Sequence, residues 1–185
     1  YDSSQGPTDY RDGGHAHHYA AIGGRCRTRL QQGAVLYCRD LGRDGDLAGR
    51  KVVVSAGGTR EPIDPVRHIT NRSSGKMGYA IAEAARDRGA NAVLVSAPGA
   101  LPDPIGVRVV HVETAREMRE AVLGECHDAE TLIMAAAVAD WRPVSAAEQK
   151  VKKGEADSWT IELTKNPDIL AEAQSERLIK VGFAA

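Results

Sequence analysis

Two glycine-rich segments carry the residue types of an anion-binding site. Residues 57–59 (GGT) follow a short apolar run, and residues 73–78 (SSGKMG) open a segment with helical periodicity. Glycine lets an anion approach the backbone, and serine hydroxyls and the unpaired N–H groups of a helix start donate hydrogen bonds to it. The same glycines would also suit tight turns of any α/β fold. The pattern therefore indicates phosphate binding and leaves a purely structural use open.

Three later segments could complete such a site. Residues 135–143 (AAAVADWRP) place small side chains at a predicted strand end, where Asp140 could accept a hydrogen bond from a base, hold a metal ion, or only cap a turn. Residues 150–153 (KVKK) could stabilise phosphate charge or form a solvated surface. Residues 164–168 (TKNPD) join a strand to a helix, which is another position suited to anions.

The glycines do not form the dinucleotide-binding fingerprint. About fifteen residues separate the first strand end from the helix start, and no acidic residue follows the second strand to hold a ribose. A mononucleotide or nucleoside triphosphate is therefore expected before a nicotinamide cofactor. A short-chain oxidoreductase would also need a Tyr-x-x-x-Lys pair, and Glu83 stands where the lysine after Tyr79 would be.

Short apolar strands alternate with amphipathic helices along the chain from Lys51 onward. Strands are predicted over residues 51–56, 92–95, 107–112, 131–137, 159–163 and 178–183, the last of them buried. This alternation predicts an α/β sandwich around a mainly parallel sheet. Ligands of such sheets bind at the carboxyl ends of the strands, which directs attention to the segments after Ala56, Ala137 and Phe183.

Three helices are predicted between these strands. The first should end at Gly89 and present an apolar face made by Met77, Ala80, Ile81, Ala84 and Ala85. The second should begin with a capping box, Thr114 with Glu117, and carry Met118, Ala121 and Val122 on one side. The third should begin at residues 166–168, with proline in its first turn.

The first residues of the chain differ from the rest. Residues 1–49 contain six Arg and six Asp but neither Lys nor Glu, and they lack a clean apolar period. We predict that residues 1–48 are a linker or the remnant of an upstream domain, and that residues 49–185 form one domain. Because the chain stops directly after a predicted core strand, we expect this domain to be truncated at its C-terminus.

Composition excludes several classes of protein. With 24 Lys and Arg, 25 Asp and Glu and a net charge of −1, the chain has no excess of cations for nucleic acid. It shows neither an apolar run of roughly 18 residues nor a signal peptide, so a cytoplasmic protein without a membrane partner is expected. Cys26, Cys38 and Cys126 form no C-x-x-C pair, and no protein-held metal site or disulfide framework is predicted.

Six segments together resemble the phosphopantothenate–cysteine ligase family. They occur in the family's order and at similar spacing over about residues 47–185. They are residues 57–67 (GGTREPIDPVR), 70–78 (TNRSSGKMG), 136–143 (AAVADWRP), 150–153 (KVKK), 165–169 (KNPDI) and 181–185 (VGFAA). The resemblance implies a Rossmann-like three-layer α/β sandwich. In bacteria this domain usually follows a flavin-dependent decarboxylase domain, so FMN would belong only to that upstream part of a longer parent protein.

The resemblance implies a two-step ligation in coenzyme A biosynthesis. The carboxylate of 4′-phosphopantothenate attacks the α-phosphate of CTP and releases pyrophosphate, and the amine of cysteine then attacks the acyl-cytidylate and releases CMP. Mg²⁺ would arrive with the triphosphate. The choice of CTP over ATP follows from the resemblance alone. An NAD(P)-binding oxidoreductase and a non-catalytic nucleotide-binding fragment are the alternatives.

The resemblance also implies roles for individual residues. Asn71 is expected to hold the acyl carbonyl and assist the cysteine step, and Lys150 to act in catalysis while contacting the nucleotide. The triphosphate, base or sugar is expected to contact Gly57, Ser73, Gly75, Gly78, Asp140, Lys150, Thr164, Lys165, Asn166, Pro167 and Phe183. The family is generally dimeric, with the active site near the subunit contact, so a homodimer or higher homo-oligomer is expected. Further lysines that the family carries downstream of VGFAA would follow Ala185.

Overall fold

The structure is a computed structural model that describes residues 45–152 and 158–183, together with the backbone of five short strands nearer the N-terminus. These strands pair antiparallel, β1 with β2, and β4 with both β3 and β5. They are β1 (Tyr10–Asp12), β2 (His15–His17), β3 (Tyr19–Ile22), β4 (Arg25–Arg29) and β5 (Val35–Tyr37). Lys153 of the predicted lysine segment and the final Ala184 and Ala185 lie outside the described residues.

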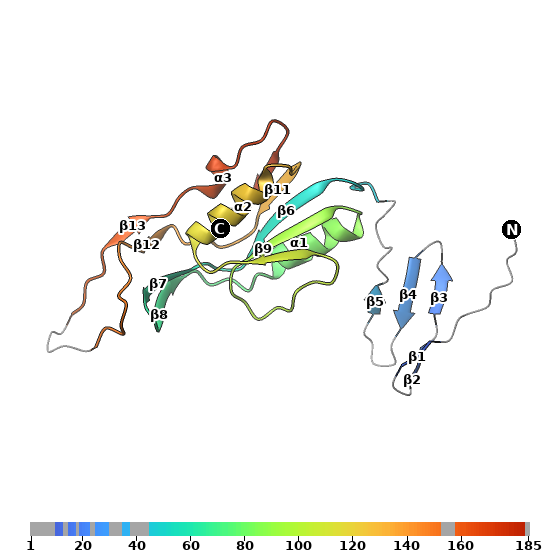
Figure 1. The fold of residues 1–185 in the computed structure, drawn as a ribbon, viewed down its shortest axis with the longest axis horizontal. Helices are drawn as coiled ribbons and strands as arrows, with labels where there is room; N and C mark the ends of the chain where they lie inside the picture. The colour runs from blue at the N-terminus through green and yellow to red at the C-terminus, as the bar shows by residue number, and fades with distance from the viewer. Residues whose placement is uncertain are drawn as a thin grey trace, which may run out of the picture.

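A five-stranded parallel sheet forms the centre of the domain (Figure 1), in the order β10-β9-β6-β11-β14. Its strands are β6 (Lys51–Ala56), β9 (Asn91–Ser96), β10 (Arg108–His111), β11 (Thr131–Met134) and β14 (Ile179–Gly182). The central strand β6 is a continuous apolar run because both faces of the sheet are covered, and Val53 and Val54 are fully buried. The predicted α/β fold with a mainly parallel sheet is confirmed.

Helices cover the two faces of the sheet and give it three layers (Figure 1). Helix α1 (Lys76–Asp87) packs with Val52, Val54 and Leu94 on one face. Helix α2 (Ala115–Cys126) and the short α3 (Ile169–Glu172) pack with Val53 and Val93 on the other. Alternate residues of each strand therefore belong to two separate apolar clusters, one on each face of the sheet.

The predicted apolar face of α1 is wrong in part. Met77 is 46% exposed, and the residues buried on this helix are Gly78, Ala82 and Ala85. The helix turns Gly78 toward β6, where an added Cβ would lie 2.6 Å from the Cβ of Ala56. A glycine that permits close packing thus decides which side of the helix faces the sheet. The helix does end as predicted, with Gly89 at a φ of 92°.

The predicted start of α2 is confirmed. The Thr114 hydroxyl oxygen accepts a hydrogen bond from the Glu117 N–H at 3.2 Å, and Met118 and Val122 are buried. A further acceptor comes from outside the helix, because the carboxylate of Glu61 accepts from the Ala115 N–H at 2.9 Å. Burial of this carboxylate is tolerated because the first N–H groups of a helix favour an anion.

Two strand predictions near the C-terminus need correction. The strand predicted over residues 159–163 is instead β13 (Leu163–Lys165), which pairs antiparallel with β12 (Trp141–Pro143) outside the parallel sheet. The strand predicted as buried is β14, and all four of its residues are exposed. The strand lies at an edge of the described sheet, where the short α3 contacts Lys180 and Gly182 through Leu170 but leaves the strand residues exposed.

A hairpin of β7 (Arg60–Asp64) and β8 (Arg67–Thr70) extends from the carboxyl end of β6. Its register pairs Arg60 with Thr70, so the residues that flank the hairpin, Thr59 and Asn71, lie at the same end of it. The hairpin contacts β12. No helix in the described part of the chain is long and apolar enough to cross a membrane.

Candidate functional site

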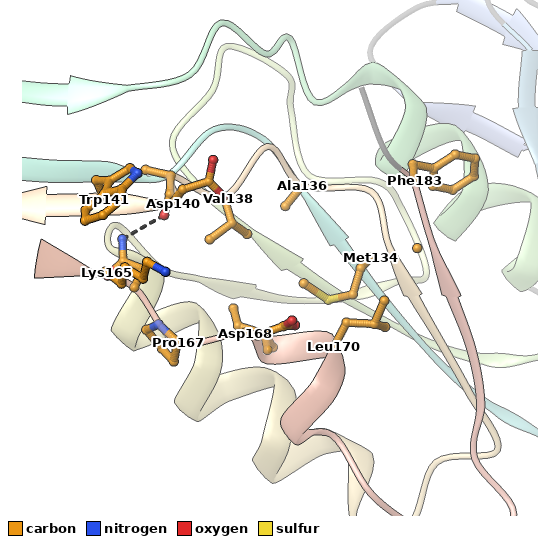
Figure 2. Close-up of a pocket in the computed structure, with 14 residues that line it drawn as sticks. Met134, Ala136, Val138, Asp140, Trp141, Lys165, Pro167, Asp168, Leu170 and Phe183 are labelled. Atoms are coloured by element: carbon orange, nitrogen blue, oxygen red, sulfur yellow. Dashed lines mark hydrogen bonds between the residues drawn. The ribbon is translucent and has the colours of Figure 1, made fainter.

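An open pocket of about 490 Å³ lies at the carboxyl ends of β11 and β14. Its lining combines apolar side chains with a few polar ones (Figure 2). The lining residues are Met134, Ala136, Val138, Ala139, Asp140, Trp141, Lys165, Asn166, Pro167, Asp168, Ile169, Leu170, Gly182 and Phe183. Five of the predicted nucleotide ligands are therefore brought together here: Asp140, Lys165, Asn166, Pro167 and Phe183.

One wall of the pocket is the segment 136–140, which we call the alanine wall. The strand predicted over residues 131–137 ends at Met134, and the backbone beyond it is tied to the end of β6 and the following turn. Ser55 Oγ accepts from the Ala136 N–H at 3.1 Å, and Gly57 O accepts from the Ala137 N–H at 2.8 Å. The next donor, Ala139 N–H, lies 2.9 Å from Thr59 Oγ1.

Two asparagine side chains hold the carbonyl groups of the alanine wall. Asn71 Nδ2 donates to Val138 O at 3.1 Å, and Asn166 Nδ2 donates to Ala139 O at 2.8 Å. The backbone N–H of Asn166 adds a 2.8 Å hydrogen bond to the Asp140 carbonyl oxygen. The wall is thus held by residues far away in sequence, which fixes the backbone against which a flat ligand would lie.

The strands β12 and β13 supply the charged side of the pocket. Arg142 donates to Lys165 O and, at 3.1 Å, to Asn166 Oδ1, which orients the Asn166 amide toward the wall. Lys165 Nζ lies 5.7 Å from the centre of the Trp141 ring. Figure 2 shows Asp140, Trp141 and Lys165 on one side of the pocket and Phe183 on the other. An anionic, planar ligand would suit this combination of a cation and two exposed aromatic rings.

The pocket floor comes from the start of α3. The side chain of Asp168 caps this helix by accepting from the Ala171 N–H at 3.0 Å. The prediction that proline occupies the first turn of this helix is therefore wrong. Pro167 lies one residue before the N-cap, Asp168, and lines the pocket. Ile169 packs into the core below it.

The predicted phosphate ligands form a second cluster beside the start of the alanine wall, between the end of β6 and the start of α1. Gly57 and Gly75 both have positive φ, at 83° and 72°, and a Cβ on Gly75 would lie 3.3 Å from Gly57 N. Ser73 Oγ accepts from the Gly75 N–H at 3.3 Å. Helix α1 has no side-chain cap, so its first N–H groups remain available to an anion. Gly78, by contrast, is buried against β6.

Two predicted site residues, Thr164 and Lys150, belong neither to the pocket lining nor to the glycine cluster. Thr164 is in β13, opposite Arg142. Lys150 is exposed, and its neighbour Val151 is held at the β7–β8 hairpin: Val151 N–H donates to Asp64 Oδ2 at 3.1 Å, and Arg67 donates to Val151 O at 2.7 Å. Hydrogen bonds from the Arg67 guanidinium and from backbone N–H groups keep the pKa of the Asp64 carboxyl well below its usual range.

Some residues that line the site carry no feature in the amino-acid sequence that would predict a functional role. Met134 and Leu170 look like ordinary core residues. Ser55 and Thr59 did have one: each is a polar residue at the end of a buried parallel strand, where ligands of α/β sheets bind. Among the described residues, no group of three or more His, Cys, Asp or Glu side chains is placed to hold a metal ion.

The chain is similar to a known protein family and to individual proteins of known name. Residues 47–185 match the sequence profile of the family described as "DNA/pantothenate metabolism flavoprotein C-terminal domain". The coenzyme A biosynthesis bifunctional protein CoaBC of Vibrio vulnificus (strain YJ016) is 48% identical over 155 residues, which cover 82% of this chain and 39% of that protein. CoaBC of Mycobacterium tuberculosis (strain ATCC 25618 / H37Rv) is 57% identical over 127 residues, which cover 68% of this chain and 30% of that protein.

Solved structures give the same picture. The crystal structure of the C-terminal domain of a coenzyme A biosynthesis bifunctional protein CoaBC has a TM-score of 0.64 and 44% identity, covering 75% of this chain and 65% of that one. The DNA/pantothenate metabolism flavoprotein of Streptococcus pneumoniae has a TM-score of 0.63 and 25% identity, covering 71% and 68%. The predicted Rossmann-like fold is thereby confirmed, and the family match agrees with the resemblance carried by the six sequence segments.

Proposed function

The chain belongs to the family of DNA/pantothenate metabolism flavoprotein C-terminal domains, and we propose that it is the part of a longer protein that ligates cysteine to 4′-phosphopantothenate at the expense of CTP. The curated relatives named above are bifunctional proteins of coenzyme A biosynthesis, and the chain spans 39% of the length of one and 30% of the other. The activity proposed here is that of the ligase part alone.

The observation that carries the proposal is the alanine wall shared by two sites. The pocket lies on one side, with volume and aromatic surface for a nucleobase and sugar. The glycine cluster of Gly57 and Gly75 lies beside the start of the same wall, through the Gly57 O to Ala137 N–H hydrogen bond of 2.8 Å. A nucleotide with its base in the pocket could thus direct its phosphates toward the start of α1.

The proposed reaction has two steps. A carboxylate oxygen of 4′-phosphopantothenate attacks the α-phosphorus of CTP, the bond to the β-phosphate oxygen breaks, and pyrophosphate leaves with that electron pair. The cysteine amine then attacks the acyl carbon, loses a proton, and CMP leaves. Formation of the mixed anhydride is needed because a free carboxylate is a poor acyl donor.

Residues of this chain supply alignment and charge. The Asn71 amide, which donates to Val138 O of the wall, is proposed to hold the acyl carbonyl of the intermediate. Lys150 is the cation proposed to neutralise the triphosphate. Lys165, in the pocket lining, is proposed to contact the base. Mg²⁺ would be bound by the triphosphate oxygens and would supply charge neutralisation there.

A homodimer in the cytoplasm is part of the proposal. Val144, Trp159 and Leu163 are exposed apolar residues in and beside the β12–β13 pair, with relative exposures of 56%, 49% and 40%. Their burial against a second copy would account for these side chains. The anchoring of the Lys150 segment at the β7–β8 hairpin, outside the pocket lining, is also compatible with a site completed at a subunit contact.

The decisive experiment measures pyrophosphate release by the complete gene product with 4′-phosphopantothenate, Mg²⁺ and CTP, in the absence of cysteine. We expect release that depends on both substrates, and little with ATP or NAD as controls. Addition of cysteine should then give phosphopantothenoylcysteine and CMP. Nucleotide binding without any release would overturn the proposal in favour of a non-catalytic nucleotide-binding module.

A further inference from the structure

We infer that Thr59 is a positioning residue that sets the alanine wall of the pocket and thereby its selectivity for the nucleobase. The inference rests on the proposed function, because it takes the pocket to hold the base of a nucleotide. Thr59 lies in the turn between β6 and β7 and does not line the pocket itself. It would therefore act through the backbone that it holds.

The contact of Thr59 is buried and directional. Its side chain has no exposed surface, and Oγ1 accepts a hydrogen bond of 2.9 Å from the N–H of Ala139, which is 3% exposed. The same peptide group carries the Val138 carbonyl oxygen, to which Asn71 Nδ2 donates at 3.1 Å. One planar peptide group is thus held at its donor by Thr59 and at its acceptor by Asn71.

The neighbouring N–H groups are the ones that a ligand could use. Among the hydrogen bonds of the described residues, none employs the N–H of Val138 or of Asp140, and both residues line the pocket. Because consecutive peptide planes share a Cα atom, the orientation of the 138–139 peptide restricts the planes on either side. Thr59 thereby influences where the pocket presents its backbone donors.

Without the Thr59 oxygen, the Ala139 N–H would have no replacement acceptor within the alanine wall. Ala139 N–H is buried, and a buried donor without an acceptor is unfavourable enough that the backbone is expected to shift or admit water. Ser55 Oγ and Gly57 O hold the preceding residues, Ala136 and Ala137, and would keep the start of the wall in place. The change should therefore be confined to the part that contacts the base.

The test compares Thr59→Val with Thr59→Ser in the complete gene product. Valine keeps the branched shape and removes the acceptor, whereas serine keeps the acceptor and removes a methyl group. Thr131→Val serves as the matched control, because it makes the same change at the amino end of β11, away from the pocket. Binding of CTP, CMP and ATP is measured by calorimetry, and KM for CTP and for 4′-phosphopantothenate by pyrophosphate release.

For Thr59→Val we expect the Kd and KM for CTP to rise at least tenfold. The preference for CTP over ATP in binding should become smaller, and the KM for 4′-phosphopantothenate should not change. Thr59→Ser should stay within threefold of the wild type, as should Thr131→Val. Equal losses in the valine and serine variants, or unchanged nucleotide binding in Thr59→Val, would overturn the inference. If the wild type binds CTP but releases no pyrophosphate, the proposed function fails while the binding comparison still tests Thr59.

Discussion

Thr59 and Asn71 hold the two ends of one peptide group: Thr59 Oγ1 accepts from the Ala139 N–H at 2.9 Å, and Asn71 Nδ2 donates to Val138 O at 3.1 Å. The two residues flank the β7–β8 hairpin, whose terminal pair is Arg60 and Thr70. The pairing of the hairpin strands therefore brings the Thr59 and Asn71 side chains to the same peptide group. The residues that flank a hairpin outside the parallel sheet thus help to fix the backbone of the pocket.

The Asn71 amide gives the first prediction. In Asn71→Asp the donor to Val138 O is lost, and a carboxylate stands where the acyl carbonyl of the intermediate would be held. At saturating CTP we expect pyrophosphate release to persist, with a raised KM for CTP because Val138 O loses its donor. The formation of phosphopantothenoylcysteine should fall by about a hundredfold, the loss typical of a removed oxyanion donor. Both products are followed in one assay with and without cysteine. Equal loss of both steps would contradict a specific role in amide formation.

Lys150 provides a test of the activation step. Lys150→Gln removes a cation that we propose to neutralise the triphosphate, so the rate of pyrophosphate release should fall by roughly tenfold or more. Arg88→Gln removes a cation that is paired with Asp46 on the opposite side of the fold and should leave this rate unchanged. An activation rate in Lys150→Gln equal to that of the wild type would remove Lys150 from the site.

The packing of α1 against β6 predicts opposite effects for two helical glycines. A Cβ at Gly78 would lie 2.6 Å from both Ala56 Cβ and Ser55 O, whereas nothing lies within 4 Å of a Cβ at Gly124 in α2. Gly78→Ala should lower the free energy of unfolding by about 1–3 kcal/mol through overpacking. Gly124→Ala should raise it by about 0.5–1 kcal/mol, since alanine favours the helix. Urea unfolding of both variants measures these changes, and a stabilising Gly78→Ala would contradict the close packing.

The Asp64 carboxylate predicts a dependence of stability on acid pH. Its folded-state pKa lies below that of an unfolded aspartate, mainly because of the hydrogen bonds from Arg67, so the ionised form favours the folded state. This contribution is present at neutral pH and is lost as the pH falls below about 4. The wild type should therefore be more stable than Asp64→Asn at pH 7, with the difference shrinking toward pH 3.

Urea unfolding across this pH range checks the Asp64 prediction. Asp103→Asn is the control, because that carboxylate is exposed and pairs only with the exposed His111 among the described residues. Its stability difference from the wild type should be small at every pH. A difference between the wild type and Asp64→Asn that stays constant from pH 7 to pH 3 would exclude the proposed ion pair.

Local sequence alone determined much of the scaffold. The run Lys51–Ala56 is apolar on both faces, as a strand covered by two layers must be, and it forms β6 as predicted. Thr114 and Glu117 start α2, and Gly89 takes the positive φ that ends α1. These features depend on neighbours within a few residues, so their side-chain chemistry is sufficient to predict them.

Tertiary structure decided what the sequence patterns left open. Helix α1 packs against β6 through Gly78, β14 lies exposed at an edge of the described sheet, and Val151, next to Lys150, is hydrogen-bonded to the β7–β8 hairpin. Most of all, the meeting of Thr59 and Asn71 at the Val138–Ala139 peptide depends on the register of a hairpin and the pairing of β6 with β11. Such contacts join residues about 70 to 80 positions apart, and their geometry is set by the packing of whole elements, which no local periodicity encodes.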